Sequence, residues 1–146
     1  MGVRVPRALF QQTLDQLRAC GNGQSECVAY WIADQDEPHV ILRLVHPEHR
    51  SGSFGYEVDS GYVTQFFLDL RRDRETVRVQ VHTHPAEASH SRTDDLFALA
   101  PAPGFLSLVI PGFALGPAVL VGCHLVEIGD DGNWNEIDPE VTIELV

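Results

Sequence analysis

The chain has 146 residues, of which 44% are hydrophobic and 21% charged, a composition typical of one globular domain. Its formal net charge of −11 argues against a nucleic-acid partner, because phosphate binding needs clustered lysine and arginine. No apolar run is long enough to span a bilayer, and the first residues lack the apolar segment of a signal peptide. We therefore expect a single cytoplasmic domain, residues 1–146, without a nucleic-acid or membrane partner. Its oligomeric state is left open.

The spacing of apolar residues predicts a chain of strands interrupted by helices. The segment 26–33 is apolar on both faces, which indicates a central strand, and 47–57 is a polar loop. Such a chain favours an α/β domain with a mixed sheet. In chain order the predicted elements are a helix over 7–20, strands over 26–33 and 39–46, a helix over 60–72, a strand over 76–84, a helix that begins at Ser91, strands over 105–110 and 118–128, and, after a hairpin turn over 129–134, a short edge strand.

The strand "VRVQVHTHP" ends in two histidines, His82 and His84. Successive side chains point to opposite faces of a strand, so residues two apart share a face. The two imidazoles therefore project side by side where Pro85 ends the strand. A pair of histidines on a strand also occurs by chance on protein surfaces, so the pair needs support from its surroundings.

That support comes from the segment that follows the strand. Ser91 and Asp94 stand three residues apart at a predicted helix start, a spacing that places them on one face. Ser91 would serve there as N-cap or as a hydrogen-bond donor to a developing oxyanion. His82, His84 and Asp94, with a fourth position left to water, have the composition of a catalytic zinc site. Zinc would lower the pKa of that water to about 7.

The sequence "HTHPAEASHSRTD" resembles the signature of the JAMM (MPN-type, prokaryotic JAB) zinc metalloproteases. The resemblance implies a JAMM (cytidine-deaminase-like) domain, in which a curved mixed β-sheet is flanked by helices. It also implies that His82, His84 and Asp94 bind Zn²⁺ and that Ser91 steadies the tetrahedral intermediate. The loop before Ser91 is one residue shorter than usual, so Asp95 is the alternative third ligand.

The same resemblance implies a catalytic glutamate on an early strand, as general base and acid. Glu26, which opens "ECVAYWIA", occupies the matching place, and Glu87 is the local rival. Many relatives have a glycine-rich strand after the glutamate, and this chain does not, which leaves the substrate open.

The three cysteines, Cys20, Cys27 and Cys123, form no C-x-x-C pair. We therefore expect neither a disulfide framework nor a cysteine zinc knuckle, and interpret them as small buried hydrophobic residues.

Four further features could line a site. His46 and His49, in "HPEHR", would join a second metal site, contact substrate or lie in a polar surface loop, which is the simplest interpretation. His90 would line the cleft. His124 is expected to be a core or edge residue with hydrogen-bond partners. Residues 101–117 would form a buried strand with stiff turns on both sides, and "PGFALGP" would be one of these turns or a flap over the cleft.

The resemblance thus implies a zinc-dependent metallopeptidase or isopeptidase. The resemblance implies that it acts, like a deubiquitinase, at the C-terminal tail of a ubiquitin-like or sulfur-carrier protein. The alternatives are a non-catalytic interaction scaffold of the same fold and a cupin-type metal enzyme.

Overall fold

The computed structural model describes residues 2–47, 49–52, 55–86 and 102–146. The helices predicted over 7–20 and 60–72 and the strands predicted over 26–33, 39–46, 76–84 and 105–110 are present, with ends that move by one or two residues. The helix predicted from Ser91 lies outside the described residues. In chain order the elements are β1 (Val3–Val5), α1 (Arg7–Gly21), β2 (Val28–Asp34), β3 (Glu37–Val45), β4 (His49–Gly52), β5 (Gly55–Val58), α2 (Ser60–Asp73), β6 (Glu75–Thr83), β7 (Leu106–Ile110), the 3₁₀ turn η1 (Gly112–Ala114), β8 (His124–Ile128), β9 (Trp134–Ile137), α4 (Pro139–Thr142) and β10 (Ile143–Leu145).

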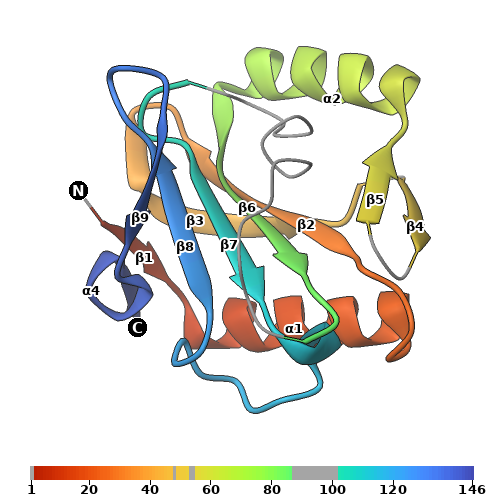
Figure 1. Ribbon diagram of the computed structural model, residues 1–146. Helices are drawn as coiled ribbons and strands as arrows, with labels where there is room; N and C mark the ends of the chain where they lie inside the picture. Colours follow the sequence, from red (N-terminus) through yellow and green to blue (C-terminus); the bar gives the residue numbers. More distant parts are fainter. Residues whose placement is uncertain (1, 48, 53–54, 87–101) are drawn as a thin grey trace.

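One mixed, curled sheet organises the described chain (Figure 1). Its strand order is β10-β1-β3-β2-β6-β7-β8-β9, and β4 and β5 form a separate hairpin. β2 lies between β3 and β6 and pairs antiparallel with both, which confirms its central place. β6 and β7 run parallel, whereas β8 and β9 pair antiparallel beyond them. β9 is therefore the edge strand that the hairpin turn predicted.

The two long helices cover opposite faces of this sheet (Figure 1). α1 buries a stripe of apolar residues against one face, and α2 covers the other with Phe66 and Leu70. Successive side chains of β2 point to the two faces in turn. Trp31 packs in the hydrophobic cluster under α1, and Tyr30 packs in the cluster under α2. The Trp31 Nε1–H donates to Thr13 Oγ1 of α1 at 2.9 Å, which satisfies the buried indole. Both faces of the central strands are thus dry, as the apolar run over 26–33 indicated.

Two expectations about the irregular parts were wrong. The strand expected over 118–128 begins only at His124, because its partner β7 ends at Ile110 and leaves nothing for 118–123 to pair with. The polar loop expected over 47–57 contains β4 and β5, which pair with His49 opposite Val58. Polar residues and glycines hid the hairpin from an apolar pattern.

Both ends of the chain add strands that the sequence pattern missed. β1 and β10 pair in parallel at the sheet edge, with Val3 opposite Ile143. They are short, so they contain too few residues for an alternating pattern to be visible. Among the described residues, no helix is long and apolar enough to cross a bilayer.

Candidate functional site

The residue pairs of β2 and β6 bring the predicted site residues together. Val28 lies opposite His82 in the antiparallel ladder. One step further, the Cys27 N–H donates to Thr83 Oγ1 at 2.9 Å, and the Thr83 N–H donates to the Cys27 carbonyl at 3.1 Å. Glu26 therefore stands across from the end of the strand that carries the two histidines.

The side chains of that strand end form a compact polar group on the α2 face of the sheet. Glu26 Oε1 lies 3.6 Å from His84 Nε2. The His82 and His84 rings have centroids 5.2 Å apart. His82 is fully buried and Glu26 is 4% exposed, although such polar side chains are usually exposed to solvent. Two imidazoles are ligands that a metal ion can use, and a carboxylate close to them could accept a proton.

The backbone around His84 is fixed on both sides. Its N–H donates to the Ile110 carbonyl at 3.0 Å, and its carbonyl accepts from the Phe113 N–H at 2.9 Å. Gly112 donates in turn to the Ala86 carbonyl at 2.9 Å. The segment "PGFALGP" is therefore bonded to the strand end that carries His84, and its role as a flap stays a prediction.

The remaining residues of the predicted site lie outside the described residues. These are Glu87, His90, Ser91, Asp94 and Asp95. The third ligand, the choice between Asp94 and Asp95, and the oxyanion donor Ser91 therefore stay predictions. His124 lies at the start of β8, between β7 and β9, with its Nδ1 3.6 Å from Glu136 Oε1, and its expected hydrogen bonds stay a prediction.

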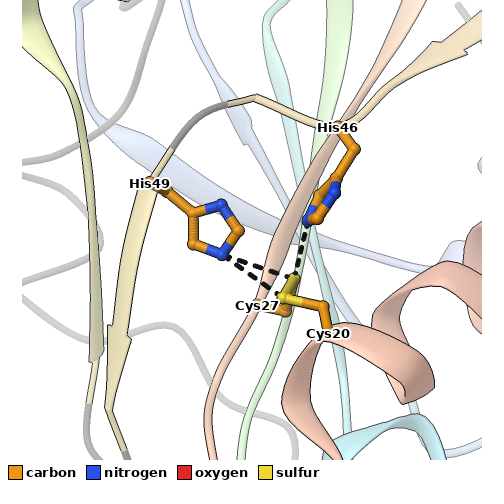
Figure 2. Close-up of side chains that lie close together, drawn as sticks. All are labelled: Cys20, Cys27, His46 and His49. Atoms are coloured by element: carbon orange, nitrogen blue, oxygen red, sulfur yellow. Dashed lines mark hydrogen bonds between the residues drawn. A yellow bond between two sulfur atoms is a disulfide. The ribbon is translucent and has the colours of Figure 1, made fainter.

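A second group of ligating residues lies on the other face of β2. The expectation that the cysteines would not pair was wrong: Cys20, in the last turn of α1, and Cys27 form a disulfide with an S–S distance of 2.16 Å. His46 and His49 approach this sulfur pair from the connection between β3 and β4 (Figure 2). Within the part of the chain that the structure describes, this is the group whose His, Cys, Asp or Glu ligand atoms all lie within 4.8 Å of one another.

The two histidines of this group are not merely parts of a polar surface loop. His46 Nε2 lies 3.1 Å from Cys27 Sγ, and His49 Nε2 lies 3.3 Å from Cys20 Sγ. Burial and the neighbouring His49 lower the pKa of His46, which favours the neutral imidazole that can ligate a metal. Sequence patterns did not group the two histidines with the cysteines, because the four residues lie at the end of α1, just before β2, just after β3 and at the start of β4.

Comparisons with known proteins identify the family. The family model "Prokaryotic homologs of the JAB domain" matches residues 6–137. The chain belongs to the prokaryotic JAB family. Over 149 aligned residues this JAB protein is 31% identical to "Probable metalloprotease y4jG" of Sinorhizobium fredii (strain NBRC 101917 / NGR234), and the match covers 99% of the chain and 92% of the relative.

Solved structures show the same fold. The JAB protein matches the solution structure of protein DSY2949 from Desulfitobacterium hafniense with a TM-score of 0.68 at 17% identity, covering 99% of the chain and 92% of that structure. It matches AF2198, a JAB1/MPN domain protein from Archaeoglobus fulgidus, with a TM-score of 0.58 at 14% identity, covering 99% and 98%. The fold implied by the resemblance is therefore confirmed, and the cupin alternative was wrong, because the curled sheet is that of JAB1/MPN proteins.

Proposed function

We propose that this JAB protein is a zinc-dependent metallopeptidase that cleaves a peptide or isopeptide bond at the C-terminal tail of a ubiquitin-like or sulfur-carrier protein. The observation that carries the proposal is the approach of Glu26 to His84, with His82 beside them, at the paired ends of β2 and β6. Family membership and the relative named as a probable metalloprotease support the same chemistry.

The chain's own residues divide the work. His82 and His84, with Asp94, would hold a zinc ion, which supplies a Lewis acid that lowers the pKa of water to about 7. Glu26 accepts a proton from the attacking water and delivers it to the leaving amine. The dry surroundings strengthen this electrostatic arrangement, because the effective dielectric constant falls on burial. Ser91 donates a hydrogen bond to the oxyanion of the substrate.

The proposed substrate class rests on the family resemblance and on the extended shape of a ubiquitin-like protein's C-terminal tail. The tail of a ubiquitin-like protein is an extended segment, which can bind by adding a strand to a sheet edge. The cytoplasm is the compartment that we propose.

The decisive experiment uses the zinc-loaded protein with ubiquitin-like and sulfur-carrier proteins from the same genome. Each substrate carries either a peptide extension or an isopeptide-linked amine at its C-terminus, and intact mass spectrometry follows the products. We expect cleavage after the natural C-terminal residue. Glu26→Gln should slow it by about 10²- to 10⁴-fold, the usual contribution of a general base.

The matched control is Glu37→Gln, which removes an exposed carboxylate at the start of β3 and should leave the rate unchanged. Cleavage that survives Glu26→Gln would contradict the role of Glu26. A zinc-loaded wild type that cleaves none of the substrates would favour the interaction scaffold.

A further inference from the structure

We propose that Cys20, Cys27, His46 and His49 form a second metal site, which binds zinc when the disulfide between the two cysteines is reduced. Two thiolates and two imidazoles are a common ligand set for structural zinc. Because all four ligands come from the protein, the site has no position left for water or substrate. Its role is therefore to hold the fold together, in contrast to the open site at His82 and His84.

The distances suit a tetrahedral ion. With Zn–S bonds near 2.3 Å and Zn–N bonds near 2.0–2.1 Å, a sulfur and a nitrogen on the same zinc lie about 3.5 Å apart. His46 Nε2 lies 3.1 Å from Cys27 Sγ, and His49 Nε2 lies 3.6 Å from the same sulfur. The third separation, His49 Nε2 to Cys20 Sγ, is 3.3 Å. The imidazoles therefore already stand near the places that zinc requires (Figure 2).

A second, independent observation is the orientation of His49. Its other ring nitrogen, Nδ1, lies 2.8 Å from the Pro47 carbonyl oxygen. A carbonyl can only accept, so the proton is on Nδ1 and the lone pair of Nε2 faces the sulfurs. Zinc-bound histidines are commonly fixed in this way, by donating their second nitrogen to a carbonyl or carboxylate. The tautomer is thus already set for metal binding.

The sulfur atoms decide between two states. In the disulfide they are bonded to each other, whereas on zinc they would lie about 3.8 Å apart. A dithiol reductant supplies two electrons and two protons, opens the Cys20–Cys27 bond to two thiols and becomes a disulfide itself. Zinc then binds both sulfurs as thiolates and releases the two protons to water. Metal binding and the disulfide therefore exclude each other.

Either state ties the same three segments together. Cys20 lies in the last turn of α1, Cys27 precedes β2, His46 follows β3, and His49 begins β4. Cys27 directly follows Glu26, and its backbone bonds to Thr83, between the two histidines of the first site. Reduced protein without metal loses this fixation.

The test is a titration of reduced, metal-free protein with Co²⁺, followed by absorption in the near ultraviolet. Thiolate–Co²⁺ bonds give a strong charge-transfer band there, and sites built from imidazole and carboxylate do not. We expect the band to appear, to saturate at about one ion per chain in His84→Ala, where only the cysteine site is left intact, and to be displaced by zinc. His84→Ala should keep the band, because the first site contains no sulfur. Protein with an intact disulfide should give none.

Cys20→Ser and His49→Gln test the ligands, and Cys123→Ser is the matched control. Cys20→Ser should weaken the band, because it removes one of the two thiolate ligands, His49→Gln should weaken cobalt binding more than about tenfold, and Cys123→Ser should change nothing. Circular dichroism establishes that each variant is folded. If Cys20→Ser does not fold, His49→Gln provides the test of the ligands. A reduced, folded wild type without the band, or a band of unchanged intensity and affinity in Cys20→Ser, would overturn the proposal.

Discussion

Glu26 and His84 meet across the paired ends of β2 and β6, with 3.6 Å between Oε1 and Nε2. Their side chains are 5% and 12% exposed, so the contact is made away from water. The proposed general base and a proposed metal ligand thus meet although they are far apart in the sequence. The position of each side chain therefore depends on the register of two strands.

Substitutions of Glu26 and His84 should have different effects on the metal content of the protein. In protein with the disulfide closed, so that only the first site can bind, we expect about one zinc per chain for wild type and for Glu26→Gln. His84→Ala should lose the metal, because an imidazole ligand is removed. Elemental analysis of tag-free protein gives the numbers, and His39→Ala, at the far end of β3, is the control. Equal zinc in wild type and His84→Ala would remove the first site.

The buried hydrogen bond between α1 and β2 should be costly to remove. Thr13 donates to the Leu9 carbonyl at 2.8 Å and accepts from Trp31 at 2.9 Å, and it is fully buried. Thr13→Val leaves the indole N–H without its acceptor, so we expect the free energy of unfolding to fall by about 1–3 kcal/mol in urea denaturation. Thr64→Val is the control, because Thr64 makes the same bond to Ser60 on an exposed face of α2. Equal losses in both variants would show that burial adds nothing.

The guanidinium of Arg18 should hold the segment "PGFALGP" in place. It donates to the Ala114 and Gly116 carbonyls from α1. Arg18→Ala should raise amide hydrogen exchange at Leu115, whose N–H donates to Gly112 at 3.0 Å. Arg7→Ala, an exposed change on the same helix, is the control. Fast exchange in the wild type would instead indicate a flap, and uniform protection in both proteins would exclude the tether and the flap alike.

Cys123 should react slowly in the folded protein. Burial raises the pKa of its thiol from 9.0 to about 11, and the thiolate is the reactive form. At pH 8 we expect alkylation to be ~100-fold slower than in the unfolded chain, from the smaller thiolate fraction. Mass spectrometry of disulfide-bonded protein isolates this one thiol.

The same shift gives a direction for stability. As the pH rises, the Cys123 thiol loses its proton in the unfolded chain before it does so in the folded protein. The stability that its protonated form adds to the folded state is therefore complete below pH 9 and declines as the pH rises toward 11. A native alkylation rate equal to the unfolded one at pH 8 would contradict this environment.

Local patterns predicted more of the first site than of the second. Alternation along β6 was enough to place His82 beside His84, because both lie on one strand. The approach of Glu26 depends on the pairing of Val28 with His82, which no local pattern contains, and it came from the family resemblance. In the same way, the start of β8 could not be foreseen without knowing where β7 stops.

The second group shows why spacing can mislead. Cys20 and Cys27 are seven residues apart, across a helix end and a turn, and match no ligand motif. His46 and His49 follow β3, and their meeting with the cysteines depends on how β3 packs beside β2. Tertiary packing, rather than sequence separation, brings these four side chains together.

Thr83 stands between His82 and His84 of the first site in the sequence. Its hydroxyl accepts a hydrogen bond from the backbone N–H of Cys27, a proposed ligand of the second site. The two proposed metal centres are therefore back to back across one layer of backbone. Thermodynamic linkage requires any influence between them to be reciprocal. If filling the cysteine site tightens zinc binding at the histidines, zinc at the histidines must tighten the cysteine site by the same factor. The redox state of one sulfur pair would then set the metal affinity of the opposite face.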